Sequence, residues 1–275
     1  MKKAAASKPT VPAPKASASV PSIDVINFAS DAGKGMEGTT KADMAIPFLT
    51  MLQGLSPQLR TVDGAKPGLI LNTITNELFS SVSVIPCAYQ RRFVRWAPRS
   101  QGGGYRGDVS PLDVEAGSVP GMTLVEGTYV MDAPKGTTVF FDKDGKCLFD
   151  TLVDTRNYFV LYQSANGLWS QALVSMSSTQ VKKAKNWMSQ IMGIKMKAGT
   201  EMITPAIFSH SYVLGSVDEK NNKGEWAGFS VTLKGPLTDV KLYQAASAFH
   251  AVVMAGAVKV TPPSPIHDEA DNSRF

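Results

Sequence analysis

The residues of this sequence best suited to bind an anion are arginines gathered between Tyr89 and Gly107. This stretch contains no acidic residue, and its arginines are interleaved with aromatic residues. Guanidinium groups bind phosphate through paired N–H donors, and aromatic rings stack on bases. The pattern predicts a groove for a single-stranded nucleic acid, and an arginine-rich strand with a solvated face is the alternative. The candidates are Tyr89, Arg91, Arg92, Phe93, Arg95, Trp96, Arg99, Tyr105 and Arg106.

A second basic group lies in a segment with helical spacing. Apolar residues recur three and four positions apart from Val181 to Ile191, and Gly193 ends the pattern. Ser177 or Ser178 is the expected N-cap. The lysines lie off the apolar stripe, where a solvated helix face is the ordinary interpretation and an extended electrostatic track is the functional one. These lysines are Lys182, Lys183 and Lys185, followed by Lys195 and Lys197.

Two further segments add candidate binding residues. Lys223 and Trp226 flank the end of a polar hairpin loop, where the tryptophan is a candidate for base stacking. The C-terminus follows a proline break, is acidic and ends on an aromatic residue, which suits a solvated tail that anchors in a partner's pocket or lies over a basic groove. A frayed terminus is the alternative. The tail candidates are Asp268, Glu269, Asp271 and Phe275.

Other kinds of chemistry have weaker support in the sequence. Gly102–Gly107 matches GxGxxG, but the following Asp108-Val109-Ser110-Pro111 does not begin a helix, as a dinucleotide site requires. Two cysteines and three histidines form no metal-binding pattern, and no cofactor or metal is predicted. Asp150 and Asp154 are the one carboxylate pair that a metal-dependent nuclease would use. A protein without enzymatic activity is therefore the prediction.

Composition and patterning place these residues in a mainly β protein. The chain has 275 residues and a formal net charge of +5, and no apolar run approaches the roughly 20 residues of a spanning helix. Short strands, two helices and long loops predict an α+β fold with a β-barrel or sandwich core. We expect a disordered arm and linker at 1–43, one nucleic-acid-binding domain at 44–260 and a disordered acidic tail at 261–275.

The strand predictions follow from β-branched and aromatic runs. They cover 69–71, 80–85, 93–96, 128–131, 137–141 and 156–163, with a hairpin turn at Asp144-Gly145. Pro86 predicts an edge or a bulge. Strands at 205–217 and 226–234 are expected to pair, and a helix is expected at 242–258. Residues 102–121 are expected to form a long loop.

The segments SMSSTQVKKAKNW and NNKGEWAGFSV, together with the acidic tail that ends in Phe275, resemble single-stranded DNA-binding proteins of bacteriophages. Arg274 makes this tail less acidic than the family pattern. The resemblance implies an oligonucleotide-binding (OB) barrel elaborated by two helices and long loops. It also implies recruitment of polymerase or helicase and primase through the tail.

The sequence therefore predicts sequence-independent binding of single-stranded DNA in phage replication, recombination and repair. We expect a cytoplasmic protein of the infected host, because the N-terminus lacks an apolar signal region, with no membrane partner. Self-association is left open. The alternatives are a phage structural or assembly protein and, with less support, a metal-dependent DNA-processing enzyme.

Overall fold

The computed structural model describes residues 28–39, 45–143, 147–222, 224–258 and 260, and the chain divides into two units, Met1–Asp43 and Met44–Phe275. The first unit contains the short helix η2 (Phe28–Asp31), and Lys34 forms an ion pair with Asp31. Most of the predicted N-terminal arm and all of the predicted acidic tail lie outside the described residues. The fold and the candidate site belong to the second unit.

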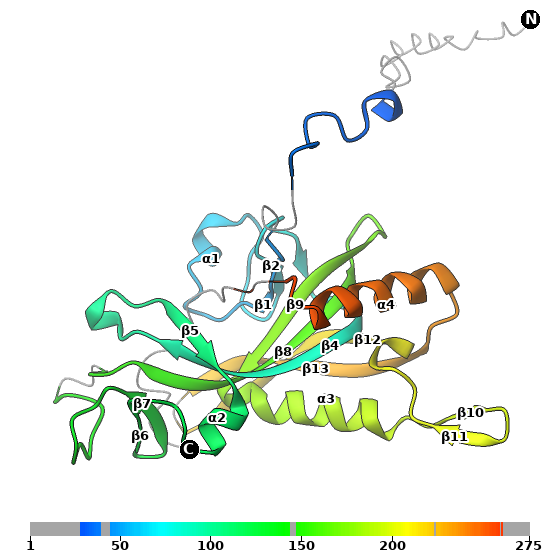
Figure 1. Ribbon diagram of the computed structural model, residues 1–275. Coiled ribbons are helices and arrows are strands. Elements are labelled where there is room, and N and C mark those ends of the chain that lie inside the picture. Colours follow the sequence, from blue (N-terminus) through cyan, green and yellow to red (C-terminus); the bar gives the residue numbers. More distant parts are fainter. Residues whose placement is uncertain (1–27, 40–44, 144–146, 223, 259, 261–275) are drawn as a thin grey trace, which may run out of the picture. The chain divides into compact units, whose positions relative to one another are not determined.

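The second unit is built on an antiparallel sheet of eight strands (Figure 1). Its main path runs through β13 (Gly224–Pro236), β12 (His210–Asn221), β4 (Ser81–Trp96), β8 (Thr151–Gln163), β7 (Thr128–Met131) and β6 (Met122–Val125). Off this path, β5 (Tyr105–Val109) pairs with β4, and β9 (Trp169–Ser177) pairs with β8. The two long central strands, β4 and β8, therefore carry most of the positions that matter below.

A bulge in β4 decides which side chains share a face of the sheet. Val84 lies opposite Tyr162, and Tyr89 lies opposite Tyr158, but the register shifts between Pro86 and Ala88. Side chains alternate along a strand, so the extra residue puts Val84 and Tyr89 on the same face although they are five positions apart. The prediction of an edge or a bulge at Pro86 is confirmed, because the strand has a bulge there, inside the sheet.

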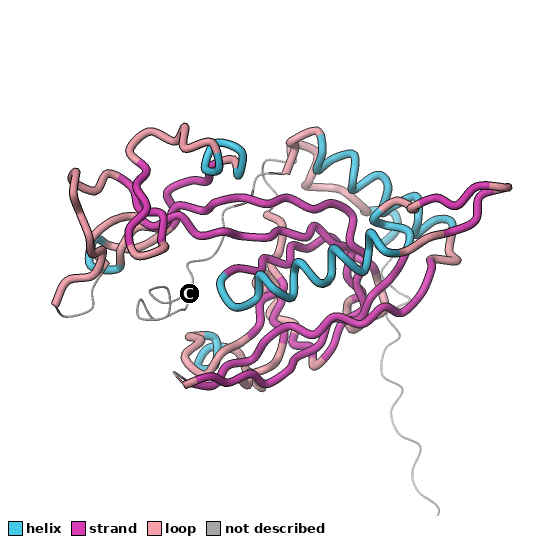
Figure 2. Tube along the Cα trace, turned by 90° about the horizontal axis from the view of Figure 1, so that it is seen from below, coloured by secondary structure: helices cyan, strands magenta, loops and turns pink. Residues whose placement is uncertain are grey.

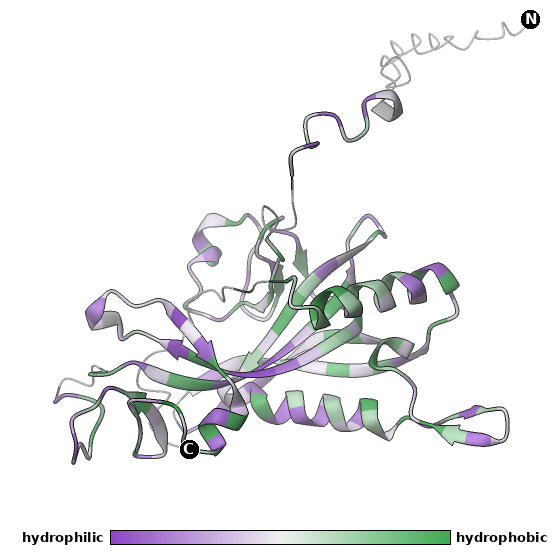
Figure 3. Cartoon of the chain, viewed as in Figure 1, coloured by the Kyte–Doolittle hydropathy of each residue, from purple (hydrophilic) through white to green (hydrophobic). Residues whose placement is uncertain are grey.

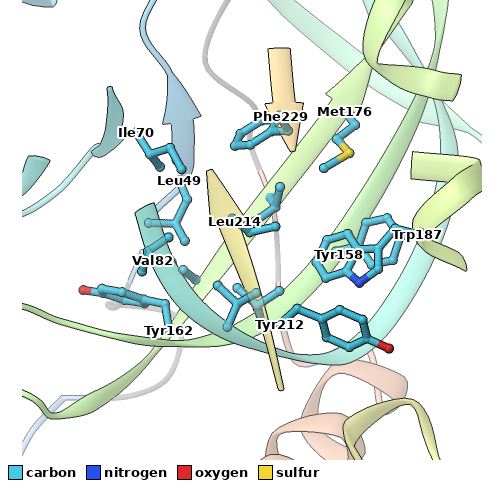
Figure 4. Close-up of a cluster of buried hydrophobic side chains, with 14 of the residues drawn as sticks. Leu49, Ile70, Val82, Tyr158, Tyr162, Met176, Trp187, Tyr212, Leu214 and Phe229 are labelled. Carbon is cyan, nitrogen blue, oxygen red and sulfur yellow. The ribbon is translucent and has the colours of Figure 1, made fainter. Parts of the chain in front are cut away.

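The two long helices cover opposite faces of this sheet. α3 (Val181–Gly193) lies across the face that carries Tyr158, where Trp187 stacks on the tyrosine ring at 4.1 Å and 21° (Figures 2 and 4). The Tyr158 hydroxyl also donates to the Ala184 carbonyl at 2.6 Å. α4 (Val240–Met254) packs through Phe249 on the next residue of β8, Phe159, which faces the other way. Each helix thus closes its own hydrophobic core.

A small three-stranded sheet approaches two edge strands of the larger sheet, β9 and β13. It consists of β1 (Leu49–Met51), β2 (Ile70–Asn72) and β3 (Leu78–Phe79), with the one-turn α1 (Gln58–Thr61) between the first two. Phe48 forms a parallel bridge with Leu173 of β9. The Gln53 amide donates to the Ala227 carbonyl of β13 at 2.8 Å and accepts from the Ala227 N–H at 3.0 Å. The β1 segment therefore lies between β9 and β13, and Leu49 and Met51 contribute to the core beneath α3.

The segment between β4 and β8 forms a lobe at one end of the sheet. After the short helix η4 (Arg99–Gln101) and β5, the helix α2 (Pro111–Glu115) begins where the Ser110 hydroxyl accepts from the Leu112 N–H. Val114 of α2 is buried against Phe93 and Leu152. This contact places α2 on the same face of β4 and β8 as α3.

A hairpin of β10 (Met196–Ala198) and β11 (Glu201–Ile203) follows α3 and extends away from the sheet in both views (Figures 1 and 2). Every residue of its two strands is exposed, including the apolar Met196, Met202 and Ile203. The remaining short helices are η5 (Ser178–Gln180), directly before α3, and η6 (Ile207–Ser209), directly before β12.

The mainly β prediction is confirmed, and the described residues contain four α-helices, two of them very short. The helix at Val181, the strand at 156–163 and the pairing of 205–217 with 226–234 are confirmed. The predicted cap is wrong: η5 intervenes, and Gln180 is the N-cap without a capping side-chain bond. The predicted loop at 102–121 contains β5 and α2. No helix of the described residues is long and apolar enough to cross a membrane.

Candidate nucleic-acid interface

The face of the sheet covered by α3 continues beyond the helix into a row of arginines. On this face Tyr89, Arg91, Phe93 and Arg95 of β4 lie opposite Tyr158, Arg156, Asp154 and Leu152 of β8, in that order. The opposite face carries the other candidates of β4, Arg92 and Trp96. The predicted cluster is thus divided between two faces.

The first group on the α3 face is centred on Asp154. Arg91 donates from Nε and Nη2 to its two carboxylate oxygens at 3.0 and 3.1 Å, and Arg156 donates from Nε and Nη2 at 3.1 and 2.8 Å. Burial alone would raise the pKa of Asp154, but the two arginines outweigh burial and hold the pKa below its ordinary value. Arg91 also donates from Nη1 to Glu115 of α2, and Arg156 donates from Nη1 to the Tyr89 hydroxyl at 3.0 Å.

The second group is centred on Asp150, whose side chain is only 4% exposed. Arg106 of β5 donates from Nη1 to both carboxylate oxygens, at 3.0 and 3.2 Å, and Arg95 donates to the same carboxylate from Nε. Arg95 also donates from Nη2 to Asp132, directly after β7, at 3.0 Å. Both groups therefore consist of a central aspartate held by two arginines, with a further carboxylate on one of them.

This arrangement bears on the predicted nuclease alternative. Asp150 and Asp154 each accept hydrogen bonds from two guanidinium groups, so a divalent cation would have to displace those bonds to reach the carboxylates. Within the described residues, no group of three or more His, Cys, Asp or Glu side chains is placed to hold a metal ion. Cys87 and Cys147 are both buried, and burial raises the pKa of Cys87 to about 12.

The aromatic candidates differ in how far they reach the surface. Phe93 is 6% exposed and belongs to the core of the lobe, with the Arg91 guanidinium 5.1 Å from its ring centre. Trp96 and Tyr105 are half-buried and meet edge to face at 6.1 Å. Tyr89 is half-buried against Tyr158. Trp96 and Tyr105 are exposed enough to stack on a base, whereas Phe93 could do so only by leaving the core of the lobe.

Asp108 organises the opposite face. The Tyr105 hydroxyl donates to it at 3.0 Å, and Arg92 Nε lies 3.6 Å from it. Burial and Asp108 together raise the pKa of Tyr105 to about 12. The glycines before Tyr105 have positive φ and lead into β5 instead of a helix, so the structural condition for a dinucleotide site is not met. Arg99 lies in η4, and its side chain is outside the described set.

The lysines of α3 have different surroundings from the arginines. Lys183 forms an ion pair with Glu219 of β12 at 3.0 Å, and the Trp226 indole N–H donates to the same residue at 2.9 Å. Lys182 and Lys185 are exposed and form no ion pair with any described residue. Lys195 and Lys197, before and within β10, also lack one, and Lys195 donates to the Thr204 hydroxyl. Hydrophilic and hydrophobic residues alternate along α3, whereas α4 is largely apolar (Figure 3).

Several candidates cannot be placed. Lys223 and the tail residues Asp268, Glu269, Asp271 and Phe275 lie outside the described residues. The structure adds residues that the sequence reasoning missed, namely Arg156 and the carboxylates of Glu115 and Asp132. The spacing Asp154-x-Arg156 was the available signal, because alternate residues of a strand share one face.

Comparison with known proteins gives a single assignment. No curated protein and no solved structure matches the chain. A family model described as Pam3 phage gp34-like protein matches residues 15–259, which include every strand and α-helix described above. The chain therefore belongs to the Pam3 phage gp34-like protein family.

Proposed function

We propose that this phage protein binds single-stranded DNA without sequence specificity, in replication, recombination and repair. The observation that carries the proposal is the unpaired lysine surface of α3 and the following hairpin. Residues 155–200 contain six basic residues and no acidic one. Four of the six, Lys182, Lys185, Lys195 and Lys197, have no ion pair within the described part of the chain. Such a surface attracts a phosphate backbone and releases counterions when it binds.

The arginine row has a second role in this proposal. It lies on the same face of the sheet as α3, and in this proposal one DNA strand contacts both the lysines and the guanidinium groups. The central aspartates hold the arginines in fixed orientations, which lowers the entropic cost of binding a polyanion. Trp96 and Tyr105, on the opposite face of the sheet, are half-buried rings in edge-to-face contact that could stack on bases.

For the fold, we propose that the sheet forms an OB-type barrel. The β1 segment provides its support, since it bridges β9 and bonds through Gln53 to β13, the two strands at the open sides of the sheet. The ladder of the described strands is not closed by backbone pairing alone. In the same proposal the tail residues recruit polymerase or helicase and primase.

The test is a titration of fluorescent oligothymidine at several salt concentrations. We expect Lys182→Gln with Lys185→Gln to weaken binding at low salt and to reduce the slope of log affinity against log salt by about 1.4, since each phosphate contact on a single strand contributes roughly 0.7. Lys66→Gln with Lys135→Gln is the matched control, because both lysines are exposed, lie outside α3 and form no ion pair with described residues. Absence of binding by the unmodified protein at low salt, or equal loss in the control, would refute the proposal.

One observation favours the structural or assembly alternative. The β10–β11 hairpin extends from the sheet with Met196, Met202 and Ile203 exposed, and a two-stranded hairpin has little stability of its own in water. A protein of that class would form large symmetric assemblies without DNA. Analytical ultracentrifugation of the DNA-free protein distinguishes the two candidates.

A further inference from the structure

We propose that Glu115 and Asp132 occupy a phosphodiester site on Arg91 and Arg95, and that single-stranded DNA displaces both carboxylates when it binds. This inference rests on the proposed function and adds a regulatory contact to it. The two carboxylates lower the affinity for DNA until a phosphate replaces them.

The four carboxylates around the arginines differ in position and exposure. Asp154 belongs to β8 and is 27% exposed, and Asp150, directly before that strand, is 4% exposed. Glu115 and Asp132 are 56% and 67% exposed and come from the end of α2 and from the residue after β7. The first pair therefore lies in or directly before β8, and the second pair is much more exposed to solvent.

Each arginine uses different nitrogen atoms for the two kinds of partner. Arg91 holds Asp154 with Nε and Nη2 and turns Nη1 to Glu115. Arg95 holds Asp150 with Nε and turns Nη2 to Asp132. A phosphate oxygen can replace Glu115 or Asp132 without disturbing the central aspartates, so the arginines stay in place during the exchange.

The balance of charge explains why displacement matters. Arg91, Arg95, Arg106 and Arg156 face an equal number of carboxylates, so this part of the face is electrically neutral in the described structure. Removal of the two surface carboxylates leaves two positive charges. Arg91 and Arg95 lie four residues apart on one face of β4, about 13 Å at roughly 3.3 Å per residue, so they contact different phosphates of one strand.

The alternative explanation is that the surface carboxylates only stabilise the lobe. Exposed ion pairs contribute little to folding, because water screens them and two side chains must be held in place. The structural explanation therefore predicts no gain in binding when the carboxylates are neutralised.

The experiment compares two variants that remove the same number of negative charges. Glu115→Gln with Asp132→Asn neutralises the two carboxylates on Arg91 and Arg95. Asp113→Asn with Glu126→Gln is the control, since Asp113 lies on the same α2, Glu126 lies between β6 and β7, and neither forms an ion pair with an arginine whose side chain the structure describes. Oligothymidine affinity is measured for both at several salt concentrations, with thermal unfolding as a check on folding.

We expect the first variant to bind several-fold more tightly than the unmodified protein at every salt concentration, because no carboxylate has to be displaced. Its salt slope should stay the same, since both complexes contact the same number of phosphates. The control should change less than twofold. Equal affinity in the two variants would overturn the inference while leaving the proposed function intact if the α3 lysines still matter. Absence of binding by the unmodified protein and by both variants would overturn inference and proposed function together.

Discussion

Asp154 shows how a single residue couples the candidate site to folding. It lies between Arg91 and Arg156 on one face of β4 and β8, and each arginine donates two hydrogen bonds to it. The two arginines are direct cross-strand neighbours, an arrangement that is destabilising for like charges unless an anion separates them. The Asp154 carboxylate is that anion.

This position predicts a pH-dependent stability. Because its folded pKa lies below the ordinary value, Asp154 stabilises the protein above its unfolded pKa of about 3.9 and loses that contribution as the pH falls through the folded pKa. Asp154→Asn should therefore lower the free energy of unfolding at pH 7 by about 2–3 kcal/mol, somewhat less than the roughly 3–5 kcal/mol of a fully buried pair. Urea unfolding from pH 7 to pH 2.5 measures the difference, which should shrink toward zero in acid.

Asp63→Asn is the control for this experiment, because Asp63 is exposed and forms no ion pair with a described residue. A difference between Asp154→Asn and the unmodified protein that stays constant over the whole pH range would contradict the prediction. It would mean that shape, and not charge, decides the effect of the substitution.

At the residue scale, the sequence predicted which side chains carry charge but not what they contact. The arginines between Tyr89 and Gly107 have no acidic neighbour in sequence, and their partners come from residues 108–154. Only the antiparallel pairing of β4 with β8 brings Arg91 to Asp154. Such a long-range contact leaves no local signal, so the sequence did not predict that arginines of the candidate groove form ion pairs with carboxylates.

At the scale of elements, the strongest periodic patterns in the sequence were sufficient to predict a helix and a hairpin. Residues 181–191 repeat at helical spacing, and the long hairpin of β12 and β13 has β-rich strands around a polar turn, so both were predicted near their observed bounds. Within the lobe, β7 was predicted at its observed bounds, but β5, β6 and α2 were not, because the glycines and prolines around them indicate turns. Its small core depends on contacts with β4 and β8.

Sequence patterning could not predict how the bulge at Pro86 changes which residues of β4 share a face of the sheet. A regular strand would place the even-numbered residues, including Arg92, on the face of Val84. The shift between Pro86 and Ala88 reverses this alternation and gives Arg91 and Arg95 to the face of α3. One extra residue in β4 therefore decides which arginines lie on the same face of the sheet as α3.

Gln53 also acts at this scale, because its amide joins β1 to an outer strand. Both backbone groups of Ala227 are satisfied by this one side chain. Gln53→Ala should lower the free energy of unfolding by about 1–3 kcal/mol, since two hydrogen bonds of roughly 0.5–1.5 kcal/mol each are lost. The Ala227 amide should also exchange its hydrogen faster. Urea unfolding and hydrogen exchange measure the two effects.

Gln244→Ala provides the comparison, because Gln244 is exposed on α4. It should leave both the free energy of unfolding and the exchange of Ala227 within error. Unchanged exchange at Ala227 in Gln53→Ala would mean that β13 does not depend on the β1 segment, and the support for a barrel would be lost.

At the scale of the whole molecule, every hydrophobic cluster that the described residues form belongs to the second unit. The residues of the four clusters lie between Ile46 and Val260, and the arginine and lysine surfaces lie between the same limits. No described residue of the first unit contributes to these cores. The division of the chain at Asp43 and Met44 therefore separates a folding unit from a segment that carries six further lysines, Lys2, Lys3, Lys8, Lys15, Lys34 and Lys41.

This division predicts that a fragment of residues 44–275 folds and binds DNA by itself. Its thermal unfolding midpoint should lie within about 2 °C of the full chain, because about 1 kcal/mol corresponds to roughly 2–4 °C in a domain of this size. Its oligothymidine affinity should stay within threefold, since the α3 lysines and the arginine row are retained. A midpoint lowered by more than about 5 °C would mean that residues 1–43 stabilise the fold. A tenfold loss of affinity at an unchanged midpoint would assign a DNA contact to residues 1–43, which carry six lysines.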